Sequence, residues 1–141
     1  FVDPQPAEWF PEALHAADVL LVTQRATVTD MSLPSKLTSY FRAGRPVVAA
    51  VADTSATANA VRRSGGGLVV HPEEPAALVD AIRQLTEDDA LSARLAAAGR
   101  AFASQHMDAE ACLARAASFV AGLLREREAA GPETAATEEV A

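Results

Sequence analysis

The sequence has few of the residues that build disulfide or metal sites. It contains a single cysteine, Cys112, so no disulfide can form within the chain and no cysteine cluster can hold a structural zinc ion. The three histidines, His15, His71 and His106, do not follow the spacing of a metal-binding motif. We therefore predict no metal and no other cofactor.

Positive charge is also scarce. The sequence contains twelve Lys and Arg residues and nineteen Asp and Glu residues, which gives a formal net charge of −7. A nucleic-acid-binding protein needs a basic face, so this class is excluded. No apolar run approaches the roughly 18 residues of a membrane-spanning helix, and no charged and then apolar leader is present. With one cysteine, the expected setting is a reducing, cytoplasmic one.

Strand-like and helix-like segments alternate along the chain. Short apolar runs that predict buried strands cover residues 18–23, 46–51 and 68–71, with a fourth strand considered at 1–2. Helical spacing predicts helices at 9–17, 34–44, 73–88, 90–104 and 108–128, and a helix ending in a glycine turn at 55–67. In the first helix, the apolar residues at this spacing are Trp9, Phe10, Leu14 and Ala17. Strands separated by helices predict an α/β fold with a parallel sheet and right-handed crossovers.

The last thirteen residues, 129–141, contain three acids, a glycine and a proline and have no apolar period. We predict one domain over residues 1–128 and a disordered tail over 129–141. Truncation after Glu128 is therefore expected to leave the thermal midpoint, measured by circular dichroism, unchanged. A fall of several degrees would show that the tail packs on the domain.

The segment from Met31 to Ala52 is unusual because it contains Lys36, the only lysine, together with Arg42 and Arg45 and no carboxylate. Parallel sheets bind ligands beyond the carboxyl ends of their strands, and this segment follows such a strand. Ser35 and Lys36 would offer a hydroxyl, free N–H groups and an ammonium at a helix start, which suits an anion or phosphate. The alternative is a solvated lysine beside a serine that only caps the helix.

Other polar features have structural explanations. Gly65, Gly66 and Gly67 follow a helix instead of opening one, which indicates a helix end and not a dinucleotide-binding turn. Glu73 and Glu74 precede a predicted helix and are interpreted as capping residues. Cys112, between alanine and leucine, is predicted to be a small buried apolar residue.

Three stretches, taken together, resemble a known family. They are FVDPQPAEWFPEALHAADVLLV, PSKLTSYFRAGRPVVAAV and SGGGLVVHPEEPAALVDAI, and they occur in the family's order between Phe1 and Phe119. The set is similar to the C-terminal domain of group-4-type glycosyltransferases with the GT-B fold, and to the branch that makes exopolysaccharides such as colanic acid. The resemblance implies a Rossmann-like, three-layer parallel sheet that forms the C-terminal half-domain of a GT-B fold, followed by trailing helices.

In that family the C-terminal domain binds a nucleoside diphosphate sugar, which is a substrate and not a cofactor. The start of the helix in the second stretch faces the donor diphosphate. The resemblance therefore implies that Pro34, Ser35 and Lys36 bind the diphosphate of the donor.

Many family members carry two glutamates eight positions apart, which contact the donor sugar and the ribose. In this sequence the two positions hold Met31 and Ser39. Ser39 is then the candidate for the ribose, and Asp30, one residue from the first position, is the candidate for the sugar. No catalytic residue is assigned.

The resemblance also implies a longer parent protein. An N-terminal acceptor-binding domain would precede this chain, and the parent would transfer a sugar to a saccharide or lipid-linked acceptor, in the cytoplasm or at the inner face of the membrane. The 141 residues alone are expected to be inactive in transfer. Two alternatives stay open: a nucleotide-sugar epimerase of GT-B architecture, and a non-catalytic α/β module that binds a partner through the edge of its sheet.

Overall fold

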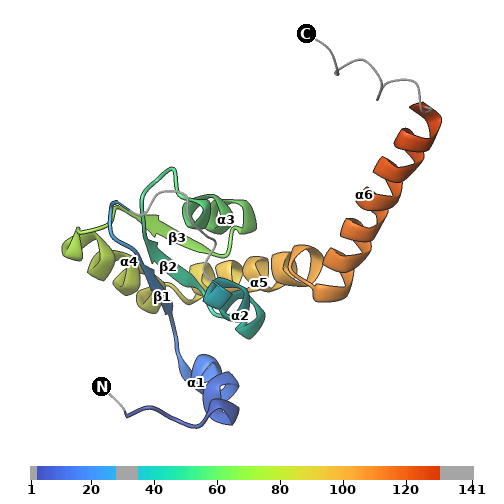
Figure 1. The fold of residues 1–141 in the computed structure, drawn as a ribbon. Helices are drawn as coiled ribbons and strands as arrows, with labels where there is room; N and C mark the ends of the chain where they lie inside the picture. Colours follow the sequence, from blue (N-terminus) through green and yellow to red (C-terminus); the bar gives the residue numbers. More distant parts are fainter. Residues whose placement is uncertain (1–2, 28–34, 131–141) are drawn as a thin grey trace. The chain divides into compact units, whose positions relative to one another are not determined.

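The computed structural model describes residues 3–27 and 35–130 (Figure 1). A 3-10 helix at Ala7–Trp9 precedes the regular elements. The helices and strands, in chain order, are α1 (Phe10–Ala16), β1 (Leu20–Thr23), α2 (Ser35–Ala43), β2 (Val47–Ala50), α3 (Ala56–Ser64), β3 (Gly67–Val70), α4 (Pro75–Glu87), α5 (Asp89–His106) and α6 (Ala109–Ala130).

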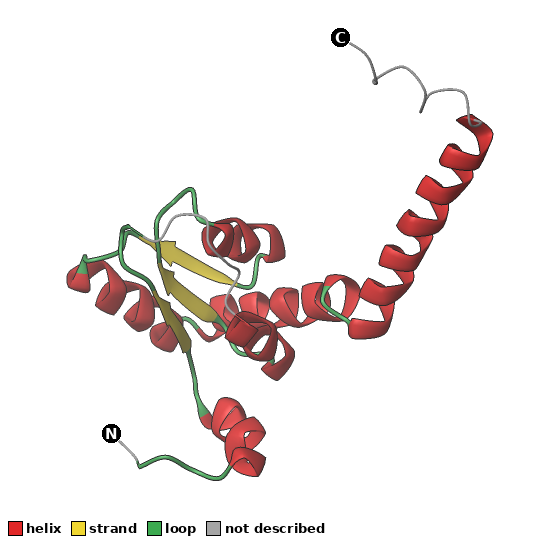
Figure 2. Cartoon of the chain, in the orientation of Figure 1, coloured by secondary structure: helices red, strands yellow, loops and turns green. Residues whose placement is uncertain are grey.

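The three strands form one parallel sheet in the order β1-β2-β3. Figure 2 shows helices on both faces of the sheet: α2 and α3 lie on one side, and α4 lies on the other. This arrangement follows from right-handed crossovers, because α2 and α3 connect strands that advance in the same direction. The predicted α/β class with a three-layer parallel sheet is confirmed.

The core is built around β2, the central strand. All four of its residues are buried, as the apolar run predicted. Val48 packs with Leu85 of α4 and Leu95 of α5. Leu37 and Phe41 of α2 are fully buried, which ties the helix of the candidate anion site to the core.

Three helix ends have the residues that the sequence predicted for them. The Ser55 hydroxyl accepts a hydrogen bond from the Ala58 N–H at 3.1 Å and caps α3. Gly44 and Gly65 end α2 and α3 with φ angles of 64° and 59°, in the left-handed region that suits glycine.

Burial on both faces was wrongly predicted for the first strand. Leu20 and Val22 are buried, but Leu21 is 40% exposed, because β1 is an edge strand of the described sheet. The predicted apolar face of the first helix was also wrong in part. Leu14 packs with Leu20, whereas Trp9 and Phe10 are 60% and 50% exposed.

The chain divides into two compact units, Phe1–Gln105 and His106–Ala141. One domain over residues 1–128 stays a prediction. In the second unit, α6 continues two residues past Glu128 to Ala130. The predicted tail beyond Ala130 lies outside the described residues. None of the helices in the described ranges is both long and apolar enough to cross a membrane.

Cys112 of α6 is exposed, so the prediction of a buried residue was wrong. Its sulfur lies 3.4 Å from the backbone oxygen of His106, and Arg115 Nη2 lies 3.1 Å from the same sulfur. Among the described residues of its own unit, α6 has no partner element on its Cys112 side, so an apolar sequence context does not produce burial there.

Candidate functional site

The start of α2 lies at the carboxyl edge of the sheet. Only Gly44, Arg45 and Pro46 separate the end of α2 from β2, so this end must lie at the amino edge. The helix runs back along the sheet for nine residues, about 13 Å. Its first turn is therefore beside the carboxyl ends of β1 and β2, where parallel sheets bind ligands.

Ser35 and Lys36 occupy this first turn, and both are exposed. The first turn of α2 contains no acidic residue. An exposed ammonium beside helix-start N–H groups is able to bind an anion. Asp30 and Pro34, the other two candidates in this region, lie outside the described residues.

The structure separates the cations that the sequence places in one segment. Arg42 lies in the last turn of α2, and Arg45 follows the helix. Arg45 donates a hydrogen bond from Nη2 to the backbone oxygen of His15 and so connects α1 to the amino edge of the sheet. Lys36 is thus the cation of this segment at the carboxyl edge.

Ser39 lies one turn after Ser35, on the same side of α2. Its side chain lines a hollow of about 240 Å³ between α1 and α2, together with Phe10, His15 and Arg42. The sequence did not indicate that α1 contributes to the surroundings of Ser39. This association arises because Leu14 of α1 packs against Ala43 of α2.

Two buried polar atoms near the carboxyl edge have no hydrogen-bond partner among residues 3–27 and 35–130. They are Oε1 of Gln24 and Oγ1 of Thr57. Gln24 directly follows β1, and Thr57 lies in the first turn of α3, which follows β2. Leaving a buried polar group unpaired costs about 1–3 kcal/mol, so such atoms indicate a place for water or a ligand. Neither residue was identified from the sequence. Gln24 directly follows β1 and Thr57 lies in the helix after β2, so their positions could have indicated them.

The described loops at this edge contain an ion pair, between Arg62 and Asp53, and a contact between His71 and Glu74. Arg62 of α3 donates to the carboxylate of Asp53 and, at 2.6 Å, to its backbone oxygen. His71 Nδ1 lies 3.5 Å from Glu74 Oε1. The predicted capping role of the two glutamates is not observed, because Glu74 makes no side-chain cap bond and Glu73 adopts a φ angle of 66°.

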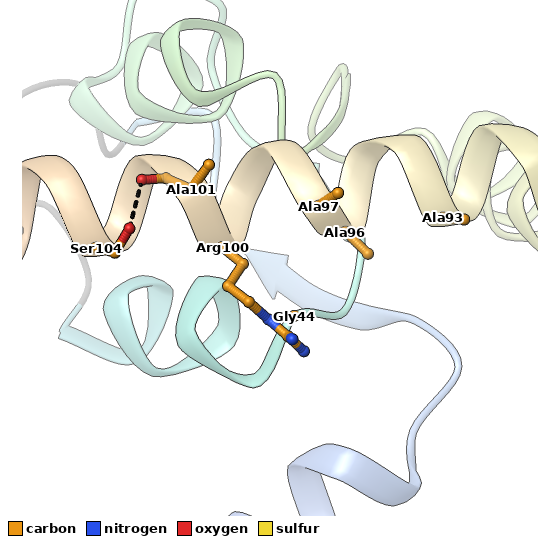
Figure 3. Close-up of a pocket in the computed structure, with 7 residues that line it drawn as sticks. All are labelled: Gly44, Ala93, Ala96, Ala97, Arg100, Ala101 and Ser104. Atoms are coloured by element: carbon orange, nitrogen blue, oxygen red, sulfur yellow. Dashed lines mark hydrogen bonds between the residues drawn. The ribbon is translucent and has the colours of Figure 1, made fainter.

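A larger hollow, of about 570 Å³, lies at the opposite edge of the sheet (Figure 3). Gly44, Arg100, Ser104 and four alanines of α5 line it. Arg100 Nη2 already contacts the backbone oxygen of Ala43 at 3.4 Å. The hollow offers little polar chemistry, and it lies at the amino edge, away from Lys36.

Within residues 3–27 and 35–130, no group of three or more His, Cys, Asp or Glu side chains could hold a metal ion. The described polar groups at the carboxyl edge include the ammonium of Lys36, the hydroxyl of Ser35 and the helix-start N–H groups of α2, together with the carboxylates of Asp53, Glu73 and Glu74.

Two solved structures are similar to the chain. HepE from Anabaena, crystallised in complex with UDP, is 25% identical with a TM-score of 0.70, over 79% of this chain. Sucrose-phosphate synthase from Thermosynechococcus elongatus is 26% identical with a TM-score of 0.67, over 93% of this chain. The chain spans only 29% and 30% of the lengths of these two proteins.

Comparison with curated protein sequences gave no match. A family profile, however, matches residues 1–88, which is more than half of the chain and includes the whole sheet. The profile is that of the glycosyl transferases group 1. Together with the parallel sheet and the two similar structures, this match shows that the chain belongs to the group 1 glycosyltransferase family.

Proposed function

We propose that this chain is the donor-binding C-terminal portion of a glycosyltransferase and that its substrate is a nucleoside diphosphate sugar. Ser35 and Lys36, with Pro34, bind the diphosphate. Ser39 is directed to the ribose and Asp30 to the sugar. The single observation that carries the proposal is the exposed Lys36 in the first turn of α2, at the carboxyl edge and with no acid in that turn.

Two further observations support a nucleotide at this edge. The oxygens of Gln24 and Thr57, which have no partner in the described part of the chain, provide hydrogen-bonding capacity where a donor with many hydroxyl groups would lie. The similar structure of Anabaena HepE contains UDP. A uridine diphosphate is therefore the first ligand to test.

In the longer protein that we propose, an N-terminal domain binds a saccharide or lipid-linked acceptor, and the sugar is transferred without a metal. The resemblance of the PSKLTSYFRAGRPVVAAV stretch supports a role in exopolysaccharide synthesis. The single cysteine agrees with a reducing, cytoplasmic location, with a lipid-linked acceptor reached at the inner face of the membrane.

Replacing Lys36 by alanine is expected to weaken UDP binding about tenfold or more. A charge-assisted contact to a partly shielded phosphate contributes about 1.5–3 kcal/mol, and each 1.4 kcal/mol is a factor of about ten in Kd. Isothermal titration calorimetry with UDP measures the change. Folding should be unchanged or slightly stabilised, because the variant removes a cation from a positive helix end.

Two variants serve as controls. Lys36→Arg keeps the charge and should keep most of the affinity, and Arg94→Ala removes an exposed cation of α5 and should bind UDP normally. Added salt should weaken UDP binding to the unmodified chain more than to Lys36→Ala. Equal affinity of Lys36→Ala and the unmodified chain would show that the lysine is only a surface residue.

A further inference from the structure

One carboxylate at the carboxyl edge of the sheet is held in a fixed position by an arginine. Asp53 lies in the loop that connects β2 to α3. Arg62 of α3 donates one hydrogen bond to the backbone oxygen of Asp53, at 2.6 Å, and a second to its carboxylate oxygen Oδ1. The planar guanidinium presents several donors in a rigid geometry, so these two bonds together restrict the rotation of the Asp53 side chain.

The other oxygen of this carboxylate faces no protein donor. The side chain of Asp53 is 70% exposed, and no hydrogen bond to its Oδ2 occurs among residues 3–27 and 35–130. An ionised carboxylate only accepts hydrogen bonds, and each of its oxygens has more than one lone pair. Asp53 Oδ2 is therefore suited to the hydroxyl groups of a ligand, whereas a phosphate at the same place would be repelled.

The position of Asp53 along the edge relates it to Lys36. The start of α2 lies beside the carboxyl ends of β1 and β2, and the Asp53 loop leaves the carboxyl end of β2 itself. The loop leads into α3, which lies on the same face of the sheet as α2 (Figure 2). Glu73 and Glu74 instead follow β3, which β2 separates from β1. Of these three carboxylates, Asp53 therefore belongs to the strand nearest to the start of α2.

We propose that Asp53 is a specificity-determining residue that accepts hydrogen bonds from hydroxyl groups of the donor sugar, with Arg62 as its positioning residue. This inference rests on the proposed binding of a nucleoside diphosphate sugar. The diphosphate of such a donor is anionic and a hexose is neutral, so Lys36 suits the diphosphate and the Asp53 carboxylate suits the sugar. Asp53 acts in addition to Asp30, since a hexose offers several hydroxyl groups.

The geometry makes this contact selective. A hydrogen bond from a hydroxyl to a carboxylate is about twice as strong as one between neutral groups. Because Arg62 already holds the Asp53 side chain, little freedom is lost when the sugar binds. A site that is built to bond a substrate hydroxyl discriminates strongly against an analogue that lacks it. Asp53 therefore distinguishes sugars by the hydroxyl groups that they present to it.

A double-mutant cycle tests the positioning role of Arg62. The probes are UDP, UDP-glucose, UDP-galactose and UDP-N-acetylglucosamine, and the Kd of each is measured by isothermal titration calorimetry. Arg62→Lys keeps the charge but loses the rigid fork, so it should raise the Kd of a recognised UDP-sugar about threefold and leave that of UDP unchanged. In an Asp53→Ala background, which has no carboxylate to hold, Arg62→Lys should have no further effect. Additive effects of the two substitutions would show that Arg62 does not act through Asp53.

Asp53→Asn, titrated with the same four ligands, tests the sugar contact itself. The Kd of at least one of the three UDP-sugars should rise about tenfold, because the acceptor loses its charge. The Kd of UDP should stay the same or fall, since a negative charge near the diphosphate is removed. Asp80→Asn is the matched control. Asp80 of α4 is 72% exposed and is paired with Arg83, but α4 lies on the opposite face of the sheet, so all four Kd values should be unchanged.

The UDP titration separates this inference from the proposed function on which it rests. If Asp53→Asn leaves the Kd of all three UDP-sugars unchanged, or weakens UDP as much as the UDP-sugars, Asp53 does not recognise the sugar. If UDP does not bind to the unmodified 141-residue chain, the proposed function itself is overturned, and the role of Asp53 with it.

Discussion

Replacing Phe41 by alanine is expected to destabilise the first unit by about 3–5 kcal/mol, which is the cost of removing a fully buried aromatic side chain. Phe41 is 0% exposed, and its ring makes an edge-to-face contact with Phe102, with ring centroids 6.3 Å apart. Two glycines leave space for this ring: a Cβ added at Gly66 would lie 2.6 Å from Phe41 Cε1, and one added at Gly99 would lie 2.9 Å from its Cδ1. The surrounding backbone cannot close over the gap, so a cavity remains.

Urea unfolding followed by circular dichroism and by the fluorescence of Trp9, the only tryptophan, measures this loss. A small domain is stable by about 5–15 kcal/mol, so the variant should unfold at a much lower urea concentration. Phe10→Ala is the matched control, because Phe10 is half exposed in the same unit, and it should cost about 1 kcal/mol or less. Similar losses in the two variants would mean that Phe41 does not anchor α2 to the core.

Replacing Gly67 by alanine is expected to destabilise the first unit by about 3 kcal/mol or more. An added Cβ would overlap the backbone carbonyl of Val47 on the neighbouring strand. Gly67 is paired with Val47 in the register of β2 and β3, and the Val47 N–H donates to the Gly66 oxygen at 3.0 Å. The strands would have to move apart, because neither backbone can rotate away as a flexible side chain would.

A thermal unfolding scan of Gly67→Ala should show a midpoint lowered by about 10 °C or more. Gly122→Ala is the matched control, since a Cβ added at Gly122 of α6 meets no atom within 4 Å. Alanine is the better helix former by up to about 1 kcal/mol, so this control should not lower the midpoint. If both substitutions are tolerated equally, the close approach of β3 to β2 at Gly67 is not as the structure shows.

Local chemistry explains which features the sequence predicted correctly. Ser55 caps α3 and Gly65 ends it because a hydroxyl and a left-handed backbone act within one helical turn. The burial of β2 was predicted because a continuous apolar run is typical of a central parallel strand. The position of Lys36 at a helix start is a local feature of the same kind, since Ser35 and Lys36 form the first turn of a helix that ends at Gly44.

Features that depend on distant segments could not be predicted in the same way. β1 has an apolar run like that of β2, but it lies at an edge of the described sheet. The order of the strands cannot be read from the sequence of any single strand. Arg45 is close to Lys36 in sequence, but it bonds His15 because α2 carries the chain across the sheet. The hollow beside Ser39 exists because α1 packs against α2.

The sequence by itself therefore determined the class of fold, the ends of α2 and α3 and the helix start that carries Lys36, because each depends on neighbours within a few residues. Tertiary structure alone decided which apolar residues are buried. Leu20 is buried and Leu113 is exposed, although both are leucines in apolar surroundings in the sequence. Burial requires a second surface, and that surface comes from residues far away in the chain.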